Sequence, residues 1–389
     1  MSKPRGSRLS LYFVATIISA IGALLLFELG SFAALNYYVY PRDQYAFYDK
    51  PDVDRERYEL YLRDRHPVLG WPVKSVDSKL DLAGSRPIPL FPDPGNECVA
   101  TYGDSFTYGS EVEHDEAWSN VLSQRLGCRV ANFGVPGYGT DQALLRFLEL
   151  PKDPSQLVIL GIYPHNVMRN VNQYRYFLTG DEEFGFKPRF ILTDEGLSRI
   201  PMPDLDYRGL MESLSNPEKY YRHEAFIPES EFGPIIMSFP YSRVFLKYVT
   251  SERVRFFILG RPGWSGFVSS GHPSGALEVT AGIVKEFSRT ATDRDKASLV
   301  VTFPSPLSYE AYLNQGEIAY QQLLDMMSAE GVVFVDLHRP IHDYLGGRKI
   351  CDLLTQRTEC VGHFNQEGNE LVAGIIYRKV NEEGLLQSK

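Results

Sequence analysis

The sequence predicts an α/β fold in which one parallel five-stranded sheet is doubly wound, with a layer of helices on each face. Two observations predict it. Five short runs are almost continuously apolar and rich in β-branched residues, which is typical of strands covered on both faces: residues 98–103, 129–134, 157–163, 299–304 and 332–337. Helical patterns alternate with them, as βαβ units require, at residues 117–126, 140–150, 280–292, 309–329 and 366–380.

The composition fits one large domain with appendages. The chain has 389 residues, of which 43% are hydrophobic and 23% charged, values that are ordinary for a globular protein. Its formal net charge is −9, and no long run of Lys and Arg occurs. We therefore expect no nucleic-acid partner, because proteins of that kind present a basic face to the phosphate backbone.

An apolar segment at residues 9–35 precedes the domain. Residues 11–27 carry no charge, and Glu28 alone interrupts the apolar run before Leu35. A membrane-spanning helix needs about 20 apolar residues, so this segment is long enough to cross a bilayer. The alternative is a cleaved signal peptide, whose apolar region is about 7–15 residues long and ends at a small-residue cleavage site that this sequence lacks.

The residues that flank the apolar segment predict its orientation. Lys3, Arg5 and Arg8 precede it, so the positive-inside rule places residues 1–8 in the cytoplasm as a short tail. Tyrosines follow it where an outer aromatic belt would lie: Tyr37, Tyr38 and Tyr40. We expect a single-pass protein of a bacterial inner membrane, with its carboxyl-terminal domain in the periplasm.

The cysteine content agrees with an oxidising compartment. Four cysteines, an even number, are compatible with disulfides. A bridge between Cys98 and Cys128 is one option because the two residues border neighbouring predicted strands, and Cys351 and Cys360 lie close together in one loop. Four unpaired thiols remain the alternative. None has the C-x-x-C spacing of a zinc or redox site, and we expect no metal and no other cofactor.

The rest of the chain divides into a connector and a domain. The connector, residues 36–97, contains a loop at residues 66–71 that we expect to dock on the domain, and four prolines at residues 87–95 that favour an extended chain. The domain follows at residues 98–389. Its stretch 174–275 breaks the alternation of strands and helices, so we expect an insertion that covers or extends the face where the strands end. Ligands of doubly wound sheets bind at that face.

A serine directly follows the first predicted strand. In residues 103–109 (GDSFTYG), Ser105 would lie in the tight turn between strand and helix, with its hydroxyl exposed and its N–H pointing into the same space. Thr107 stands where a G-x-S-x-G elbow has its second glycine, which argues against an ordinary α/β-hydrolase. The structural alternative is that Ser105 only caps the following helix.

Four segments together resemble the sequence blocks of the SGNH/GDSL hydrolases. Gly103-Asp104-Ser105 matches the first block residue for residue. Segments similar to the other blocks follow in the family order at residues 132–139 (NFGVPGYG), 163–166 (YPHN) and 362–369 (GHFNQEGN). The resemblance covers about residues 98–170 and 298–380. It implies that residues 98–389 form an SGNH-type domain with a flavodoxin-like sheet.

The resemblance also implies roles for the matching residues. Ser105 is the implied nucleophile and His363 the base that takes its proton. The implied donors to the oxyanion of a tetrahedral intermediate are the N–H groups of Ser105 and Gly137 and the side-chain amide of Asn166. The Asn166 block departs from the family, because it reads Pro-His-Asn-Val where the family has G-x-N-D.

The third member of the triad is not at its usual place. The family has an aspartate three residues before the histidine, and Cys360 stands there. Glu359 and Asp352 are the candidate substitutes, and a backbone carbonyl that orients His363 in a Ser–His dyad is the other option.

For the other residues that could take part in catalysis or metal binding, we favour structural roles. His338 and His342 have i, i+4 spacing, but Pro340 between them argues against a helix and against a metal pair. We interpret His165 as a wall residue beside the site. Asp104 should orient the serine turn through side chain–backbone hydrogen bonds.

These features predict a serine esterase or O-acyltransferase that works through a Ser–His acyl-enzyme. The resemblance to SGNH domains of polysaccharide O-acetylation implies acetyl as the acyl group and an extracytoplasmic glycan, or a small acyl ester, as the substrate. It also implies partners from polysaccharide modification. A second hypothesis is a catalytically weak glycan-binding module in an export or modification complex, and a third is a lipid esterase or thioesterase near the membrane.

Overall fold

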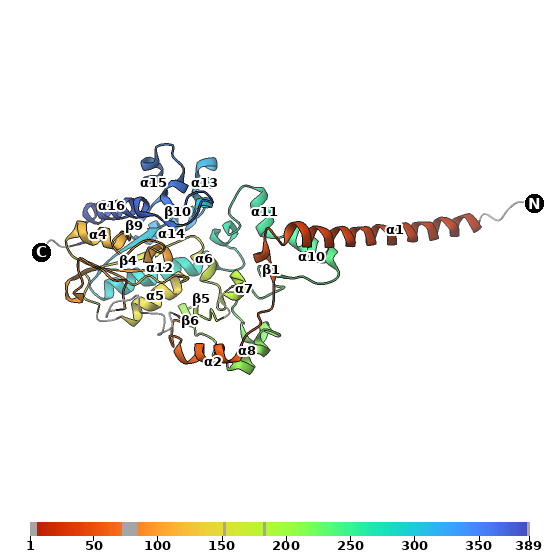
Figure 1. The fold of residues 1–389 in the computed structure, drawn as a ribbon, viewed down its shortest axis with the longest axis horizontal. Helices are drawn as coiled ribbons and strands as arrows, with labels where there is room; N and C mark the ends of the chain where they lie inside the picture. Colours follow the sequence, from red (N-terminus) through yellow and green to blue (C-terminus); the bar gives the residue numbers. More distant parts are fainter. Residues whose placement is uncertain (1–5, 72–83, 151–152, 182–183, 387–389) are drawn as a thin grey trace, which may run out of the picture.

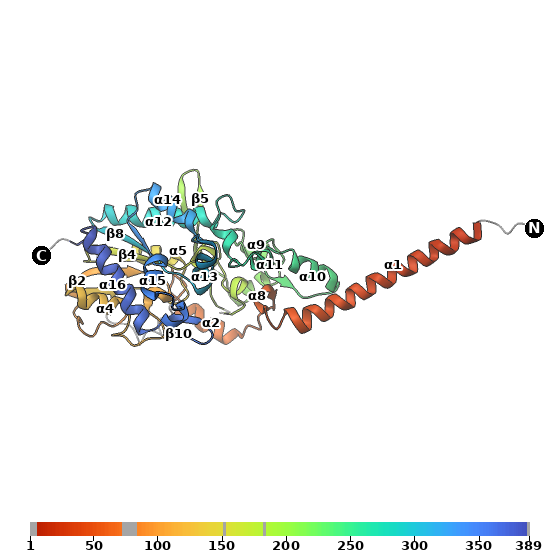
Figure 2. The same ribbon diagram turned by 90° about the horizontal axis from the view of Figure 1, so that it is seen from above.

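The computed structural model describes residues 6–71, 84–150, 153–181 and 184–386 of the chain. A single long helix projects from the domain in Figure 1 and, seen from above, in Figure 2. This helix, α1 (Gly6–Ala34), continues into a π-helical turn at Leu35–Val39. Among the described residues, one helical stretch, Leu11–Val39, is long and apolar enough to cross a membrane, and its most apolar part is not buried within the protein.

The prediction of a five-stranded parallel sheet is confirmed. The strands lie in the order β3 (Arg129–Asn132), β2 (Glu97–Tyr102), β4 (Leu157–Ile162), β8 (Ala297–Thr302) and β9 (Phe334–Asp336), and every neighbouring pair is parallel. The strand of this sheet that comes first in the sequence, β2, is therefore internal, and the order reverses beside it. Such a reversal opens a crevice at the carboxyl ends of the strands, where doubly wound sheets place their sites.

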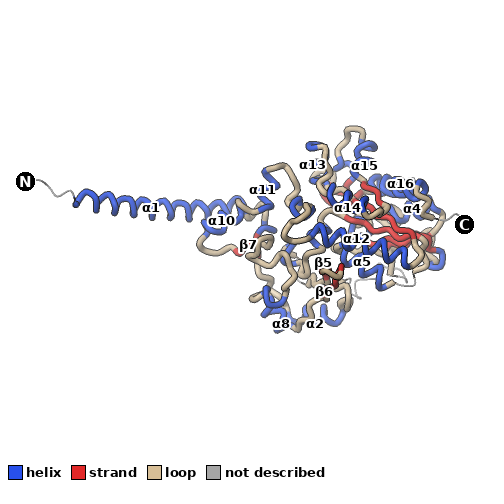
Figure 3. Tube along the Cα trace, turned by 180° about the vertical axis from the view of Figure 1, so that it is seen from behind, coloured by secondary structure: helices blue, strands red, loops and turns tan. Residues whose placement is uncertain are grey.

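Helices cover both faces of the sheet (Figure 3). One face packs against α5 (Thr140–Glu149), α12 (Ala276–Asp293) and α14 (Gln321–Ala329). The other face packs against α4 (Trp118–Leu126), α15 (His338–Leu345) and α16 (Gln366–Glu382). The predicted three-layer arrangement is thus confirmed.

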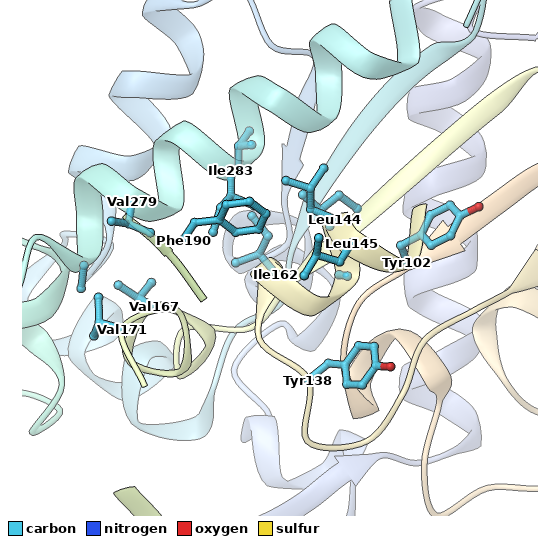
Figure 4. Close-up of a cluster of buried hydrophobic side chains, with 14 of the residues drawn as sticks. Tyr102, Tyr138, Leu144, Leu145, Ile162, Val167, Val171, Phe190, Val279 and Ile283 are labelled. Carbon is cyan, nitrogen blue, oxygen red and sulfur yellow. The ribbon is translucent and has the colours of Figure 1, made fainter. Parts of the chain in front are cut away.

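The strands supply side chains to two separate cores because successive residues point to opposite faces. In β2, Ala100 and Tyr102 join the α5–α12 core, whereas Val99 joins the α4–α16 core. Figure 4 shows part of the first core, in which leucines of α5 and Ile283 of α12 surround the end of β4. This two-sided burial is the reason that the strand sequences are almost continuously apolar.

Two helix predictions are wrong in detail. The helix predicted at residues 309–329 is two helices, α13 (Pro306–Gln315) and α14, because the chain turns at Gly316 with φ of 72°. Pro340 does not prevent a helix, since α15 starts at His338 and the proline lies in its first turn. The N–H groups of a first turn have no intrahelical partner, so a proline there removes no hydrogen bond.

The connector and the insertion pack against each other. The connector contains the 3₁₀ turns at Gln44–Ala46 and Pro94–Asn96, β1 (Phe47–Tyr48) and α2 (Arg55–Asp64). The insertion contains α7 (Tyr176–Thr179), the β5 (Arg189–Thr193)–β6 (Gly196–Ile200) hairpin, α8 (Tyr207–Ser213), α9 (Pro217–Tyr220), β7 (Ile235–Ile236), α10 (Tyr241–Val249), α11 (Glu252–Ile258) and a 3₁₀ turn at Ser265–Val268. Parallel pairing of β1 with β7 joins the two segments, so the chain leaving α1 is anchored on the insertion.

Two disulfides form, and the alternative of four unpaired thiols is wrong. Cys98 pairs with Cys128 across 30 residues, and Cys351 pairs with Cys360 across 9 residues. The first bridge ties the start of β2 to the residue before β3. The second closes the loop that contains the 3₁₀ turn Ile350–Leu353 and the β10 (Leu354–Gln356)–β11 (Val361–Phe364) hairpin.

Loss of the longer disulfide should destabilise the domain more than loss of the shorter one. In the chain-entropy description, closing a loop of this length stabilises the folded state by about 3–4 kcal/mol, and the shorter loop gives about 2–3 kcal/mol. We expect this ranking in urea unfolding of the Cys98→Ala/Cys128→Ala and Cys351→Ala/Cys360→Ala variants. Equal stability of the first variant and the wild type would contradict a structural role for that bridge.

Candidate active site

Ser105 is the first residue of a short helix that begins where β2 ends. The helix, α3 (Ser105–Tyr108), has Asp104 as its N-cap, and Asp104 Oδ1 accepts a hydrogen bond from the Phe106 N–H at 2.9 Å. The capping role is therefore filled by Asp104, and the alternative of Ser105 as the N-cap is wrong. A side chain at Gly103 would collide with the Gly161 carbonyl oxygen at 2.9 Å, so this tight turn requires glycine.

His363 lies in β11 and is held by a carboxylate. Its Nδ1 is 2.9 Å from Oε1 of Glu111. The other oxygen of Glu111 accepts hydrogen bonds from the His363 N–H at 3.3 Å and from the Thr355 hydroxyl of β10. With Nδ1 bonded to the carboxylate, the basic nitrogen of the neutral ring is Nε2, as in a serine–histidine–acid triad.

Phe106 brings the histidine strand to the serine helix. Its ring centroid is 4.9 Å from that of His363 and 4.3 Å from that of Tyr163, on which it stacks. Because Phe106 directly follows Ser105, packing of α3 on β11 sets the two predicted catalytic residues at the same edge of the sheet. Both side chains are partly exposed there, which a site that must receive substrate requires.

The carboxylate on His363 is Glu111, and neither sequence candidate occupies that position. Glu359 is exposed in the turn before Cys360. Asp352 lies in the 3₁₀ turn before β10, where its main-chain carbonyl accepts a hydrogen bond from Asn365 at 2.8 Å. The predicted Ser–His dyad oriented by a backbone carbonyl is also not what the structure shows.

Two features explain why Glu111 was missed. It lies six residues after Ser105, in a loop that no strand or helix pattern marks, and it meets His363 only through the tertiary fold. Its backbone φ is 68°, a left-handed conformation that is uncommon for a residue with a side chain. Strain of this kind persists where surrounding contacts enforce it, and it concentrates at functional sites.

The environment of Glu111 keeps its carboxylate charged. Burial raises its pKa, but hydrogen bonds from Thr355 and His363 and the attraction of the imidazole outweigh burial, and the net pKa lies below the ordinary value for glutamate. The group is therefore ionised at neutral pH and can stabilise an imidazolium that forms beside it.

Gly137 lies in the turn after β3, with a φ of 85°. Its carbonyl accepts a hydrogen bond from the Arg175 guanidinium, and a side chain at this position would lie 2.6 Å from Arg175 Nη1. Within the described chain the Gly137 N–H donates to no backbone carbonyl, and the N–H of Ser105 has no intrahelical acceptor because it opens a helix. Two N–H groups thus remain available for an oxyanion.

Asn166 opens the short helix α6 (Asn166–Arg169) after β4 and is buried. Its amide nitrogen donates to Asp104 Oδ2 at 3.0 Å and to the Tyr138 carbonyl at 3.1 Å. Both N–H groups are therefore used to tie together the loops that follow β2, β3 and β4. The predicted donation to an oxyanion stays a prediction, and it requires one of these hydrogen bonds to be exchanged for the ligand.

Two arginines and a tryptophan near the oxyanion turn were missed by the sequence reasoning. Arg169 donates to the Tyr138 carbonyl at 2.9 Å and lies 3.4 Å from Asp104. Trp71, in the docked loop predicted at residues 66–71, donates to the Pro136 carbonyl at 3.1 Å. The Arg175 guanidinium lies 5.9 Å above the Trp71 ring. Trp71 lies 98 residues before Arg169 in the sequence, so no local pattern could group it with the two arginines.

His165 forms a wall beside the site. Its ring packs 5.3 Å from Tyr163 and 6.1 Å from Trp264. Burial, together with repulsion from Arg169 and Arg253, lowers the pKa of His165 to about 3, so the ring is neutral at physiological pH.

A second chain of serine, histidine and aspartate exists elsewhere in the domain. Ser308 Oγ is 3.2 Å from His338 Nε2, and His338 Nδ1 is 3.3 Å from Asp336 Oδ1. Ser308 and His338 are fully buried, and the serine hydroxyl donates to the main-chain carbonyl of Ser305, the N-cap of α13. The second chain therefore joins β9, α13 and α15 and is not accessible to a substrate. No cluster of three or more metal-ligating side chains occurs in the described part of the chain.

Proteins similar to this chain are found among solved structures, by comparison of their folds. The solved structures that it resembles include G-D-S-L lipolytic proteins. A member of that family from Veillonella parvula is 10% identical, with a TM-score of 0.36, and the match covers 73% of this chain and 96% of that one. A catalytic mutant of an acetylxylan esterase from Geobacillus stearothermophilus is 11% identical, with a TM-score of 0.37, and the match covers 76% of this chain and 98% of that one. No protein-family profile and no curated protein matches the sequence.

Proposed function

We propose that this chain is a serine-dependent acyl-ester enzyme, a hydrolase or O-acyltransferase. The observation that carries the proposal is the Glu111–His363 pair, which packs through Phe106 against the helix that Ser105 opens. A histidine with one nitrogen bonded to a charged carboxylate beside an accessible serine is the arrangement that activates a hydroxyl nucleophile.

The residues support a two-step mechanism. Ser105 Oγ attacks the ester carbonyl while His363 Nε2 takes its proton, and the carbonyl oxygen becomes an oxyanion that the N–H groups of Ser105 and Gly137 can stabilise. The imidazolium then gives the proton to the leaving alcohol, and an acyl-Ser105 remains. Water or a sugar hydroxyl next attacks this ester, with His363 again accepting and returning a proton, so the serine is regenerated.

The substrate that we propose is a small acyl ester, acetyl above all, on a glycan outside the cytoplasm. Two features support the compartment: the apolar helix α1 and the two disulfides, which persist in oxidising environments. In this proposal α1 spans a bacterial inner membrane with the amino terminus in the cytoplasm, and the domain lies in the periplasm with partners that modify polysaccharides. The insertion at residues 174–275 supplies Arg175 and Trp264 to the site region and so would select the acceptor.

The alternative of a non-catalytic glycan-binding module loses its main support. That hypothesis rested on Cys360 at the position of the triad acid and on the altered residues around Asn166. Glu111 answers the first point, because it supplies a carboxylate at hydrogen-bond distance from His363. A charged acid bonded to the histidine serves proton transfer and has no evident purpose in glycan binding alone.

A chain-length and acceptor assay tests the proposed function. The full chain should hydrolyse p-nitrophenyl acetate at least about tenfold faster than the octanoate ester, and adding an oligosaccharide should produce an acetylated sugar detectable by mass spectrometry if the enzyme is a transferase. Release of acetate without sugar acetylation would identify a hydrolase. Preference for the octanoate ester would instead identify a lipid esterase, and absence of turnover with every ester would overturn the proposal.

A further inference from the structure

Helix α10 of the insertion packs directly against the apolar helix α1. The Glu28 carboxylate of α1 accepts hydrogen bonds from the Tyr241 N–H and, at 3.0 Å, from the Ser242 N–H, which are the first two residues of α10. Phe32 of α1 contacts the Tyr241 ring at 4.9 Å. A carboxylate at a helix N-terminus satisfies N–H groups that lack partners, so Glu28 caps α10 across 213 residues of sequence. This contact favours α1 as a retained part of the folded protein over a cleaved signal peptide.

The position of Glu28 along α1 sets the level of α10 relative to a bilayer. Counted from Leu11, about 20 residues at about 1.5 Å per residue cross the hydrocarbon layer, so the hydrocarbon crossing ends near Gly30 and the remainder of the segment 9–35 lies in the headgroup region. Glu28 lies at that boundary, and the start of α10 lies at the same level. In Figures 1 and 2, α10 runs beside the part of α1 nearest the domain, and α11 lies at the same end of the domain.

Large apolar side chains are exposed on these two helices and on the loop before them. Phe239 precedes α10 and is 76% exposed, while Phe257 and Ile258 at the end of α11 are 81% and 75% exposed. With their exposed apolar neighbours they form what we call the α10–α11 patch: Phe239, Leu246, Val249, Phe257, Ile258 and Leu259. Several large exposed apolar side chains gathered on neighbouring segments of a protein surface mark an interaction site.

The charge of the same segment points to the identity of the partner. Residues 239–261 contain one acidic residue, Glu252, and five basic residues: Arg243, Lys247, Arg253, Arg255 and Arg261. Three of the arginines each pair with a carboxylate, Arg243 with Glu229, Arg253 with Asp43 and Arg255 with Glu252. Their side chains remain 75%, 48% and 63% exposed, so guanidinium groups still lie at the surface of this segment. Apolar side chains interleaved with Arg and Lys are typical of helices that lie in the headgroup region of membranes containing anionic lipids.

We propose that the α10–α11 patch rests in the headgroup region of the same phospholipid bilayer that α1 spans. The domain then has two membrane contacts, the span itself and this patch, and it cannot rotate freely about the end of α1. The proposal rests on α1 as a membrane span and is independent of the catalytic activity.

The docked segment continues into the wall of the site. After α11 the chain reaches Trp264, which packs on His165 beside Asn166. Arg253 of α11 also forms an ion pair at 2.6 Å with Asp43 of the connector. Docking of the patch therefore fixes the height and direction of the site above the lipid surface, which suits an acyl donor or acceptor presented at the membrane.

Tryptophan quenching by brominated lipid tests the proposal on the full chain. The variants Phe257→Trp and Tyr344→Trp each place an indole at an exposed aromatic position, the first in the patch and the second on α15 in the body of the domain. Each is assembled into lipid nanodiscs in which bromine labels the upper acyl chain of phosphatidylcholine, with and without phosphatidylglycerol. The wild type provides the background of the native tryptophans.

We expect the added indole of Phe257→Trp to be quenched severalfold more than that of Tyr344→Trp, with stronger quenching when phosphatidylglycerol is present. Equal quenching of the two variants would show that the domain stands off the bilayer and would overturn the proposal. An indole emission that is blue-shifted but not quenched, and only in nanodiscs that hold two copies, would show that the patch contacts a second chain. That result would also overturn the proposal. Release of the wild-type protein from membranes by alkaline carbonate would show that α1 does not span the bilayer, and the proposal would fail with it.

Discussion

Replacement of Ser105 with alanine should abolish labelling by a fluorophosphonate probe and lower kcat/KM for p-nitrophenyl acetate by about 10⁴-fold or more. The reason is chemical: without the hydroxyl no acyl-enzyme forms, and only the oxyanion donors and binding contribute to the remaining rate. Ser105 is not the N-cap of α3, because Asp104 fills that role, so the substitution should leave the unfolding midpoint nearly unchanged. Loss of activity with retained stability is the expected signature.

Ser308 provides a matched control for this substitution. It is a serine within hydrogen-bond distance of a histidine, at 3.2 Å, but it is fully buried. The Ser308→Ala variant should keep probe labelling and activity within about twofold of the wild type, and the loss of its hydrogen bonds should lower the free energy of unfolding by about 1–3 kcal/mol. If the probe labels Ser105→Ala as strongly as the wild type, the assigned nucleophile is wrong.

Replacement of Glu111 with glutamine should lower kcat by about 10³–10⁴-fold with a smaller effect on KM. Glutamine keeps the size of the side chain but loses the charge that stabilises the imidazolium of His363 as the proton moves. Because the pKa of Glu111 is lowered, the stabilisation that its charge gives to the fold is present above the ordinary pKa of glutamate and is lost as the pH falls through the lowered value. Unfolding curves at neutral pH and at low pH separate this stability effect from the loss of catalysis.

The two sequence candidates for the triad acid serve as controls for Glu111. Glu359→Gln and Asp352→Asn should retain activity within about twofold, because neither carboxylate is bonded to His363. A variant pair in which Asp352→Asn loses the activity and Glu111→Gln keeps it would mean that the loop rearranges around the substrate, and the assignment of Glu111 would fail.

The sequence by itself determined the architecture of the domain, for a local physical reason. Strands covered on both faces must be apolar at successive positions, so the five buried strands are visible in the sequence, and their boundaries are predicted to within two residues. Ser105 was predicted as the nucleophile from its match to a family sequence block, together with its place in a turn between a parallel strand and a helix at the ligand-binding edge. His363 was found through its sequence block and its place just before the last helix.

Only the tertiary structure decided which charged groups meet. Glu111 reaches His363 across 252 residues, from a loop whose left-handed backbone leaves no periodic signal. In the sequence, Glu28 only interrupts an apolar run. In the structure, its carboxylate caps the N-terminus of α10 in the insertion. Periodicity reports which side chains a segment buries, since burial repeats along a helix or strand. Pairing of two charges depends on where separate segments pack, and neither segment alone contains that information.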